Sequence, residues 1–281
     1  MEKFALIGHP LGHSMSPLIH EKLFALSGKS GCTYELIDIA PEELLEAPER
    51  LREFSGLNVT IPHKQAVISL TDELGDSALR YNSVNCISNS GGKLIGYNTD
   101  CDGFVRSAEQ LPLGGNVAVL GCGGVGRMIA IEVARHGGDI TLAVIPQDME
   151  TAEKLTAEIQ EKCPGAAVRT TLISELSGCF DLLINATPVG MFPKTDACAV
   201  SDEVIRNAGS VFDVIYNPKE TLLMKKARAM GKTAVGGAAM LVYQAVKAHE
   251  IWYGGKFSAE DVAGIITDVE NAVDAMNKRD A

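Results

Sequence analysis

Two patterns of apolar and polar positions alternate along the chain. In the first hundred residues, apolar runs typical of strands occur at 4–8 (FALIG), 33–39 (TYELIDI) and 56–61 (GLNVTI). Between these runs, the stretches 16–28 (SPLIHEKLFALSG) and 41–54 (PEELLEAPERLREF) have the spacing and end signals of helices. The first helix is expected to begin with a serine cap, to carry proline in its first turn and to end on a glycine.

The same rhythm continues after a hairpin and a short helix. Residues 83–100 (SVNCISNSGGKLIGYNTD) predict two strands around a Ser-Gly-Gly turn, and a helix is expected from about Cys101. From Asn116 onwards, strand and helix patterns alternate again in the runs NVAVLG, GVGRMIAIEVARHGG, ITLAVI, METAEKLTAEIQEK, FDLLINAT and SVFDVIY. Such alternation predicts an α/β protein, with a parallel sheet and helices on both of its faces.

Composition narrows the class of protein. The chain of 281 residues is long enough for two domains, and its formal charge of -11 argues against nucleic acid or an acidic membrane as a partner. Seven cysteines without a CxxC pair favour free thiols in a reducing compartment. The N-terminal apolar run is too short for a signal peptide and no run could span a bilayer, so we expect a cytoplasmic protein. A monomer and a homodimer both remain open.

A glycine-rich turn follows the strand that ends near Leu120. Gly121, Gly123 and Gly126 match the pattern G-x-G-x-x-G between a predicted strand and a predicted helix. Dinucleotide binding needs such a turn, because bare backbone must approach the pyrophosphate at a helix N-terminus. The alternative is a glycine-rich turn without a ligand.

Three further clusters carry polar chemistry. In GLNVTIPHK, Asn58 and Thr60 share one face of a strand that leads to Lys64, as expected for a site wall or for an ordinary solvent-exposed strand end. In GHPLGHSMSPLIH, Ser14 and Ser16 precede a helix, where they would either cap it or face an anion. The same stretch holds His9, His13 and His20, but no carboxylate or cysteine joins them at metal-ligand spacing, so we expect no metal. Asp100 in GYNTDCDG would ordinarily be a turn or cap residue.

Taken together, the ordered motifs resemble the shikimate dehydrogenases. The matching stretches are GHPLGHSMSPLIH, GLNVTIPHK, SVN, GYNTDCDG, GCGGVGR, NATPVGM, DVIYNP and GAAMLVYQA. The resemblance implies reversible, nicotinamide-dependent reduction of 3-dehydroshikimate to shikimate, a step in the synthesis of aromatic amino acids. It also implies a small-molecule substrate and two domains: a discontinuous catalytic domain (residues 1–101 and 238–281, with C-terminal helices returning to it) and a Rossmann-type dinucleotide-binding domain (residues 102–237).

The resemblance also implies a role for each matching residue. Lys64 and Asp100 are the expected proton-transfer pair. Ser14 and Ser16 would bind the substrate's ring carboxylate with Tyr216 nearby, and the ring hydroxyls would be held by Asn58, Thr60, Asn85, Asp100 and Gln244. The expected cofactor residues are Gly121, Gly123, Gly124, Val125, Gly126, Asn185, Ala186, Thr187, Ile215, Gly237, Met240 and Asp76. For Met240 a place in the core of a packed helix, and for Asp76 a helix cap, are the alternatives.

The local sequence and the family resemblance favour different nicotinamide cofactors. The resemblance implies NADP, whose 2′-phosphate usually meets an arginine in an "NRT"-like turn after the second cofactor strand. Here the turn reads AVIPQDMET, and no lysine or arginine occurs between Arg135 and Lys154. A carboxylate suits the free 2′-hydroxyl of NAD, and Asp148 is the candidate, so the local sequence favours NAD. The alternative is that Lys154 or Arg169 reaches the phosphate.

Two rival functions share most of these motifs. A quinate/shikimate dehydrogenase that uses NAD would differ in little that the sequence displays. A non-catalytic dinucleotide-binding regulator would lack its proton-transfer groups, and the presence of both Lys64 and Asp100 disfavours it.

Smaller departures from the family are Asn82 and Ser83, where "GA" is usual, and Cys122 in the glycine loop.

Overall fold

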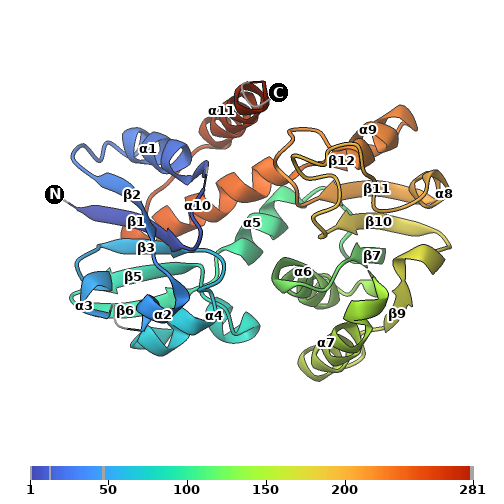
Figure 1. Ribbon diagram of the computed structural model, residues 1–281, viewed down its shortest axis with the longest axis horizontal. Coiled ribbons are helices and arrows are strands. Elements are labelled where there is room, and N and C mark those ends of the chain that lie inside the picture. The colour runs from blue at the N-terminus through green and yellow to red at the C-terminus, as the bar shows by residue number, and fades with distance from the viewer. Residues whose placement is uncertain (1, 13, 46–47, 279–281) are drawn as a thin grey trace. The chain divides into compact units, whose positions relative to one another are not determined.

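The computed structural model describes residues 2–12, 14–45 and 48–278 (Figure 1). Its contacts divide the chain into two compact units, Met1–Gly103 with Val242–Val269, and Phe104–Leu241 with Glu270–Ala281. The domain limits near residues 101 and 238 remain a prediction. The contact division assigns the last twelve residues to the second unit, whereas the sequence places everything after 238 in the first domain.

The first unit is built on a mixed six-stranded sheet with the order β2-β1-β3-β5-β6-β4. Its strands are β1 (Lys3–Gly8), β2 (Thr33–Asp38), β3 (Gly56–Val59), β4 (Glu73–Leu74), β5 (Cys86–Ser90) and β6 (Lys93–Tyr97). β1 pairs in parallel with β2 and β3, whereas β5 runs antiparallel to β3 and β6. The expected hairpin is therefore present, and it makes this sheet mixed rather than wholly parallel. Gly91 and Gly92 form its turn, and both have the positive φ that glycine adopts readily.

Several helices lie wholly or partly in this unit. They are α1 (Ser16–Leu26), α2 (Pro41–Leu44), α3 (Pro48–Leu51), α4 (Asp76–Tyr81), the first residues of α5 (Asp100–Ser107), and parts of α10 (Gly237–Tyr253) and α11 (Ala259–Asn277). The single helix expected over 41–54 is wrong. Two short helices replace it, the second beginning at Pro48, because proline is favoured in a first turn and disfavoured inside a helix. α10 lies close against β3, since a Cβ on Gly56 would come within 2.4 Å of Trp252 Nε1.

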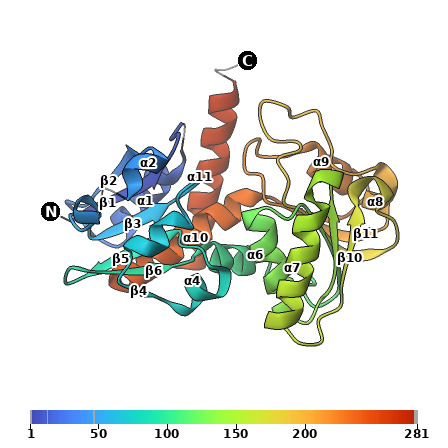
Figure 2. The ribbon, with the colours of Figure 1, turned by 60° about the horizontal axis from the view of Figure 1, so that its bottom comes forward.

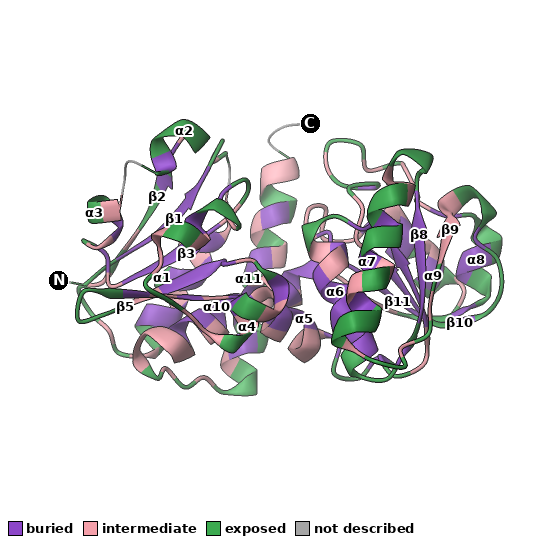
Figure 3. Ribbon diagram, turned by 90° about the horizontal axis from the view of Figure 1, so that it is seen from below, coloured by how far each residue is buried: buried purple, intermediate pink, exposed green. Residues whose placement is uncertain are grey.

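The second unit is a wholly parallel sheet with the order β12-β11-β10-β7-β8-β9. Its strands are β7 (Asn116–Leu120), β8 (Asp139–Val144), β9 (Val168–Leu172), β10 (Phe180–Asn185), β11 (Ala208–Asp213) and β12 (Thr233–Val235). The helices that lie wholly in this unit include α6 (Gly124–Arg135), α7 (Met149–Lys162), α8 (Asp202–Arg206) and α9 (Leu222–Ala229). The helices α6 and α7 lie side by side (Figure 2). Figure 3 shows buried strands behind α7, whose outer face is exposed.

The strand order of the second unit places a switch point between β7 and β10. The chain proceeds from β7 to β8 and β9 on one side, and then returns to add β10, β11 and β12 on the other. In sheets of this kind, ligands bind beyond the carboxyl ends of the strands at such a point. The glycine-rich turn follows β7, so the sequence motif lies at the switch point that the fold creates.

Close packing at the glycine turn predicts a sharp difference between two glycines of α6. A Cβ on Gly126 would lie 2.3 Å from the Gly121 carbonyl oxygen, whereas a Cβ on Gly124 would meet nothing within 4 Å. Gly126→Ala should therefore lower the free energy of unfolding by about 1–3 kcal/mol, the usual cost of overpacking. Gly124→Ala is the matched control and should leave stability nearly unchanged. Equal thermal unfolding midpoints for the two variants would contradict the assigned packing.

Candidate functional site

An accessible ion pair lies at the centre of the first unit's polar cluster. Lys64 follows β3, Asp100 is the first residue of α5, and Lys64 Nζ donates to Asp100 Oδ2 at 2.6 Å. The two side chains are 26% and 17% exposed, so solvent or a ligand can reach both. A lysine ammonium and a carboxylate in contact can hold and exchange a proton with a bound hydroxyl group.

Asn85 holds this ion pair in place. Its Nδ2 donates to Asp100 Oδ1 at 2.8 Å, while its Oδ1 accepts from the backbone N–H of Thr99 at 2.6 Å. The side chain of Asn85 is only 3% exposed, so these bonds form away from bulk water, where an unpaired amide would be costly. Asp100 is therefore a bonded member of the polar cluster, whereas its position in the sequence alone suggests an ordinary turn residue.

Other predicted substrate residues join the same array. Asn58 Nδ2 donates to the Asn85 carbonyl at 3.4 Å, and Thr99 Oγ1 lies 3.4 Å from Gln244 Oε1, so a residue of α10 reaches the cluster. Thr60 is half-buried at the end of β3. The sequence analysis missed Thr99, although it lies within the matched motif GYNTDCDG, because a buried threonine beside a charged residue carries no pattern of its own.

The two serines lie at the start of α1. Ser16 is the first residue of the helix and Met15 occupies the cap position, so the expected serine cap is wrong in position. Ser14 Oγ nevertheless accepts from the Ser16 N–H at 3.2 Å. The serines thus lie at the N-terminus of a helix, where the helix dipole favours an anion.

The histidines of this region have separate partners. His9 Nδ1 bonds to Asp38 Oδ1 at 2.6 Å, and the buried His20 bonds to His249 at 2.8 Å. His13 lies outside the described residues. Among the described residues, no group of three or more His, Cys, Asp or Glu side chains could hold a metal ion.

In the second unit, the glycine turn offers open backbone. Gly121 has a φ of +89°, which favours glycine, and Gly123 occupies the cap position of α6. Nothing lies within 4 Å of the Cβ positions of Gly123 and Gly124, whereas Gly126 packs against the turn. Open glycines at the N-terminus of a helix fit a phosphate group. Val125 is half-buried beside them.

A buried carboxylate connects the ends of β10 and β11. Asp213 Oδ1 accepts from Asn185 Nδ2 and from the Ile215 N–H, both at 3.1 Å, and Asp213 Oδ2 accepts from Thr221 Oγ1 at 2.7 Å. Asn185 Oδ1 in turn accepts from Thr187 Oγ1 at 2.6 Å. Burial raises the pKa of Asp213 from 3.8 to about 6, against the opposing effect of these donors. The side chain of Asn185 is therefore used inside the protein, where it shapes the loop that begins with Ala186.

The remaining candidates are spread over both units. Tyr216 is half-buried in the second unit, and burial raises the pKa of its phenol. Gly237 begins α10 and donates its N–H to the Ile215 carbonyl at 3.1 Å, while Met240 is 8% exposed and belongs to the core, as its helical spacing suggested. Asp76 is exposed in the first unit, where it follows the capping residue of α4 instead of capping the helix itself.

The turn after β8 contains no basic side chain. Ile145 and Pro146 are exposed there and line a cavity of about 410 Å³ with residues that follow β9 and precede α8. Asp148 is half-buried just before α7. The two cations considered as alternative phosphate ligands are engaged elsewhere: Lys154 Nζ pairs with Glu150 at 2.6 Å, and Arg169 Nε donates to Thr141 Oγ1 at 2.8 Å.

Comparisons with known proteins agree on one family. Residues 6–87 match the family model described as the shikimate dehydrogenase substrate binding domain. A curated shikimate dehydrogenase (NADP(+)) of Caldanaerobacter subterraneus subsp. tengcongensis is 38% identical over 267 residues, which cover 92% of this chain and 94% of the relative. Within the described parts of the chain, no helix is long and apolar enough to cross a membrane.

Solved structures show the same similarity. A shikimate dehydrogenase in complex with NADP+ superposes with a TM-score of 0.86 at 35% identity, and 95% of each chain is covered. Shikimate 5-dehydrogenase from Listeria monocytogenes, in complex with shikimate and NAD, has a TM-score of 0.83 at 27% identity, with 94% of this chain and 96% of that chain covered.

The raised pKa of Asp213 predicts a pH-dependent cost to stability. A folded-state pKa above the unfolded value means that Asp213 contributes stability below about pH 4 and loses it as the pH rises through about 6. Asp213→Asn keeps the shape without the charge, so its free energy of unfolding relative to the unmodified protein should rise by roughly 2 kcal/mol between pH 4 and pH 8. Urea denaturation at both pH values measures this difference. A difference that does not change with pH would contradict the prediction.

Proposed function

Since this chain belongs to the shikimate dehydrogenase family, we propose that it catalyses the reversible, nicotinamide-dependent reduction of 3-dehydroshikimate to shikimate. The reaction is a step in the synthesis of aromatic amino acids. The observation that carries the proposal is the accessible Lys64–Asp100 pair, held by Asn85 in the unit that the family model matches. A dinucleotide-binding regulator would not need such a pair.

The proton steps follow from these side chains. The nicotinamide supplies the hydride for reduction and accepts it in the reverse direction. As hydride reaches the carbonyl carbon, negative charge develops on the oxygen, and the Lys64 ammonium donates the proton that makes the hydroxyl group. Asp100, whose Oδ1 is occupied by Asn85, keeps Oδ2 towards the lysine and holds the ammonium in place. In the reverse direction, the hydroxyl proton returns to this pair as hydride leaves the same carbon.

The other polar side chains would orient the substrate. Ser14 and Ser16, at the N-terminus of α1, suit the ring carboxylate, with Tyr216 as a further candidate neighbour. Asn58, Thr60, Asn85 and Gln244 suit the ring hydroxyls, because amides and hydroxyls can each donate and accept. For the cofactor, Gly121, Gly123, Gly124, Val125 and Gly126 suit the pyrophosphate. Asn185, Ala186, Thr187, Ile215, Gly237 and Met240 are proposed on the nicotinamide side, and Asp76 is a further proposed cofactor neighbour.

For the nucleotide, we propose acceptance of NAD, alone or beside NADP. The named relative is an NADP(+) enzyme, while the Listeria structure contains NAD, so the family includes proteins that bind each nucleotide. Support for NAD comes from the turn after β8, where Ile145 and Pro146 are exposed and Lys154 and Arg169 have other partners. A 2′-phosphate at this turn would lack the donors that usually bind it.

One assay tests the proposed function directly. Initial rates are measured with shikimate and with quinate, each against NAD and NADP. Faster turnover of shikimate supports the proposal, and faster turnover of quinate favours the quinate/shikimate alternative. Binding of a nucleotide without turnover of either substrate would make the protein a regulator and overturn the proposal.

Lys64→Met should lower kcat by roughly two to four orders of magnitude, because a general acid or base contributes about this much. The KM for shikimate should change far less. Lys93→Met is the matched control, since Lys93 is an exposed lysine of the same sheet that pairs with Glu73. If Lys64→Met raises KM and leaves kcat intact, the lysine binds the substrate and does not transfer the proton.

The nucleotide proposal predicts a kcat/KM with NAD at least equal to that with NADP. Asp148→Ala should lower efficiency with NAD selectively, because it removes the carboxylate proposed to meet the 2′-hydroxyl. Ile145→Arg should raise efficiency with NADP by supplying a planar donor for the phosphate. A strong preference of the unmodified protein for NADP would overturn the proposal.

A further inference from the structure

Tyr34 contacts two of the proposed substrate residues without belonging to any of the matched motifs. It lies in β2, and its hydroxyl donates to Asn58 Oδ1 at 2.8 Å across β1, the strand between β2 and β3. The same hydroxyl also interacts with the side chain of Ser16. One oxygen thus connects the side chain proposed for the carboxylate with a side chain proposed for a ring hydroxyl.

The direction of these bonds determines how Asn58 is oriented. The Asn85 carbonyl can only accept, so the Asn58 group that faces it at 3.4 Å must be Nδ2. Asn58 Oδ1 then faces Tyr34, and Tyr34 must donate. Burial raises the pKa of Tyr34 well above its usual value, so the phenol keeps its proton and remains a donor. The second N–H of Asn58 is left available for a ligand.

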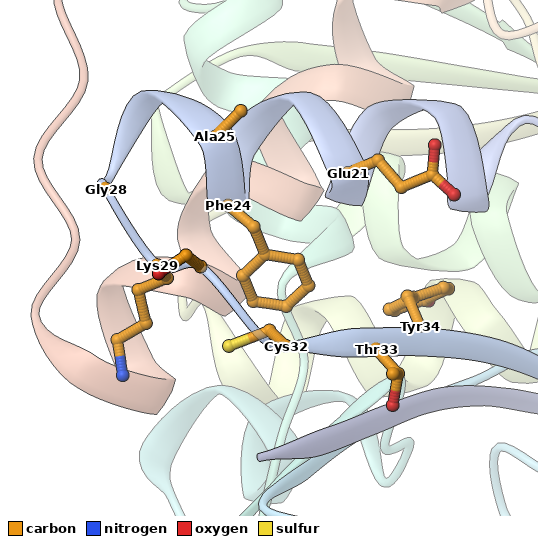
Figure 4. A pocket seen from close by; sticks show the side chains of 9 residues that line it. Glu21, Phe24, Ala25, Gly28, Lys29, Cys32, Thr33 and Tyr34 are labelled. Atoms are coloured by element: carbon orange, nitrogen blue, oxygen red, sulfur yellow. The ribbon is translucent and has the colours of Figure 1, made fainter. Parts of the chain in front are cut away.

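The ring of Tyr34 is held independently of its hydroxyl. It stacks on the buried ring of His20 with centroids 4.1 Å apart and an interplanar angle of 8°. Figure 4 shows Tyr34 on its strand facing α1, in the lining of a cavity of about 600 Å³ that also includes Phe24 and Glu21. Removing the hydroxyl therefore leaves the stacked ring in place.

His20 is itself fixed by a directed chain of hydrogen bonds. Ser27 Oγ donates to the Leu23 carbonyl, so Tyr253 donates to Ser27 at 3.2 Å. His249 Nδ1 then donates to the Tyr253 oxygen, which leaves His249 Nε2 to accept from His20 Nδ1 at 2.8 Å. This chain sets the plane of the His20 ring and, by stacking, the plane of Tyr34.

We propose that Tyr34 is a positioning residue for the substrate: its hydroxyl fixes the amide of Asn58 so that one N–H faces a ring hydroxyl. The inference rests on the proposed function, because it assigns Tyr34 to the shikimate site. Tyr34 acts through Asn58 and needs no contact with the reacting atoms.

The test is Tyr34→Phe, which removes one hydroxyl and keeps the stacked ring. We expect the KM for shikimate to rise about 5- to 50-fold, the range for an acceptor that loses its buried donor. The kcat and the KM for the nucleotide should stay within about twofold, because neither the ion pair nor the glycine turn is touched. Tyr81→Phe is the matched control: Tyr81 is a fully buried tyrosine of α4 in the same unit, outside this chain of hydrogen bonds, and its KM for shikimate should not change.

A double-mutant cycle shows whether Tyr34 acts through Asn58. Adding Tyr34→Phe to Asn58→Ala should not raise the KM for shikimate any further, because the amide that Tyr34 orients is already absent. An unchanged KM in folded Tyr34→Phe, or an equal extra loss in the Asn58→Ala background, would overturn the inference. An unmodified protein that does not turn over shikimate would overturn the proposed function instead, so the two failures are distinguishable.

Discussion

The polar cluster of the first unit depends on the side chain and backbone of Asn85. Its amide holds Asp100 and the Thr99 backbone, its carbonyl accepts from the Val59 N–H at 2.9 Å, and its own N–H donates to Tyr97. One residue therefore fixes the ends of β3 and β6 relative to each other. Because these bonds are buried, breaking any one leaves an unpaired polar group, which favours a single geometry for Lys64 and Asp100.

Asp213 has the same kind of role in the second unit. It joins the last residue of β10 to the backbone that follows β11, where the proposed nicotinamide contacts begin. The two junctions differ in charge. Asn85 is neutral, whereas Asp213 must keep a carboxylate buried, and burial accordingly raises its pKa to about 6. Burying the charged Asp213 therefore costs stability at neutral pH, whereas burying the neutral Asn85 carries no such charge penalty.

The sequence alone predicted those features that depend on residues close together in the chain. Gly121, Gly123 and Gly126 act through one turn, so their pattern predicted a dinucleotide-binding turn between a strand and a helix. The switch point at which this turn lies follows only from the strand order of the folded sheet. The contact between Lys64 and Asp100 joins residues 36 positions apart, and only the family resemblance brought them together. Tyr34 and Thr99 were missed because their roles arise from partners in distant parts of the sequence. The contact of Asn185 with the cofactor stays a prediction, and its amide is bonded within the protein to Asp213, Thr187 and Val189.

The residues proposed to recognise the substrate are buried, whereas the turn proposed to recognise the nucleotide is exposed. The amides proposed for the substrate are buried and mutually bonded, so a change at one of them disturbs the whole array and a ligand lacking a hydroxyl leaves an N–H unpaired. The turn after β8 is exposed at Ile145 and Pro146, and it tolerates substitution at little cost to the fold. Under the proposed function, single substitutions in this turn would therefore change the nucleotide preference and leave the proposed substrate array intact.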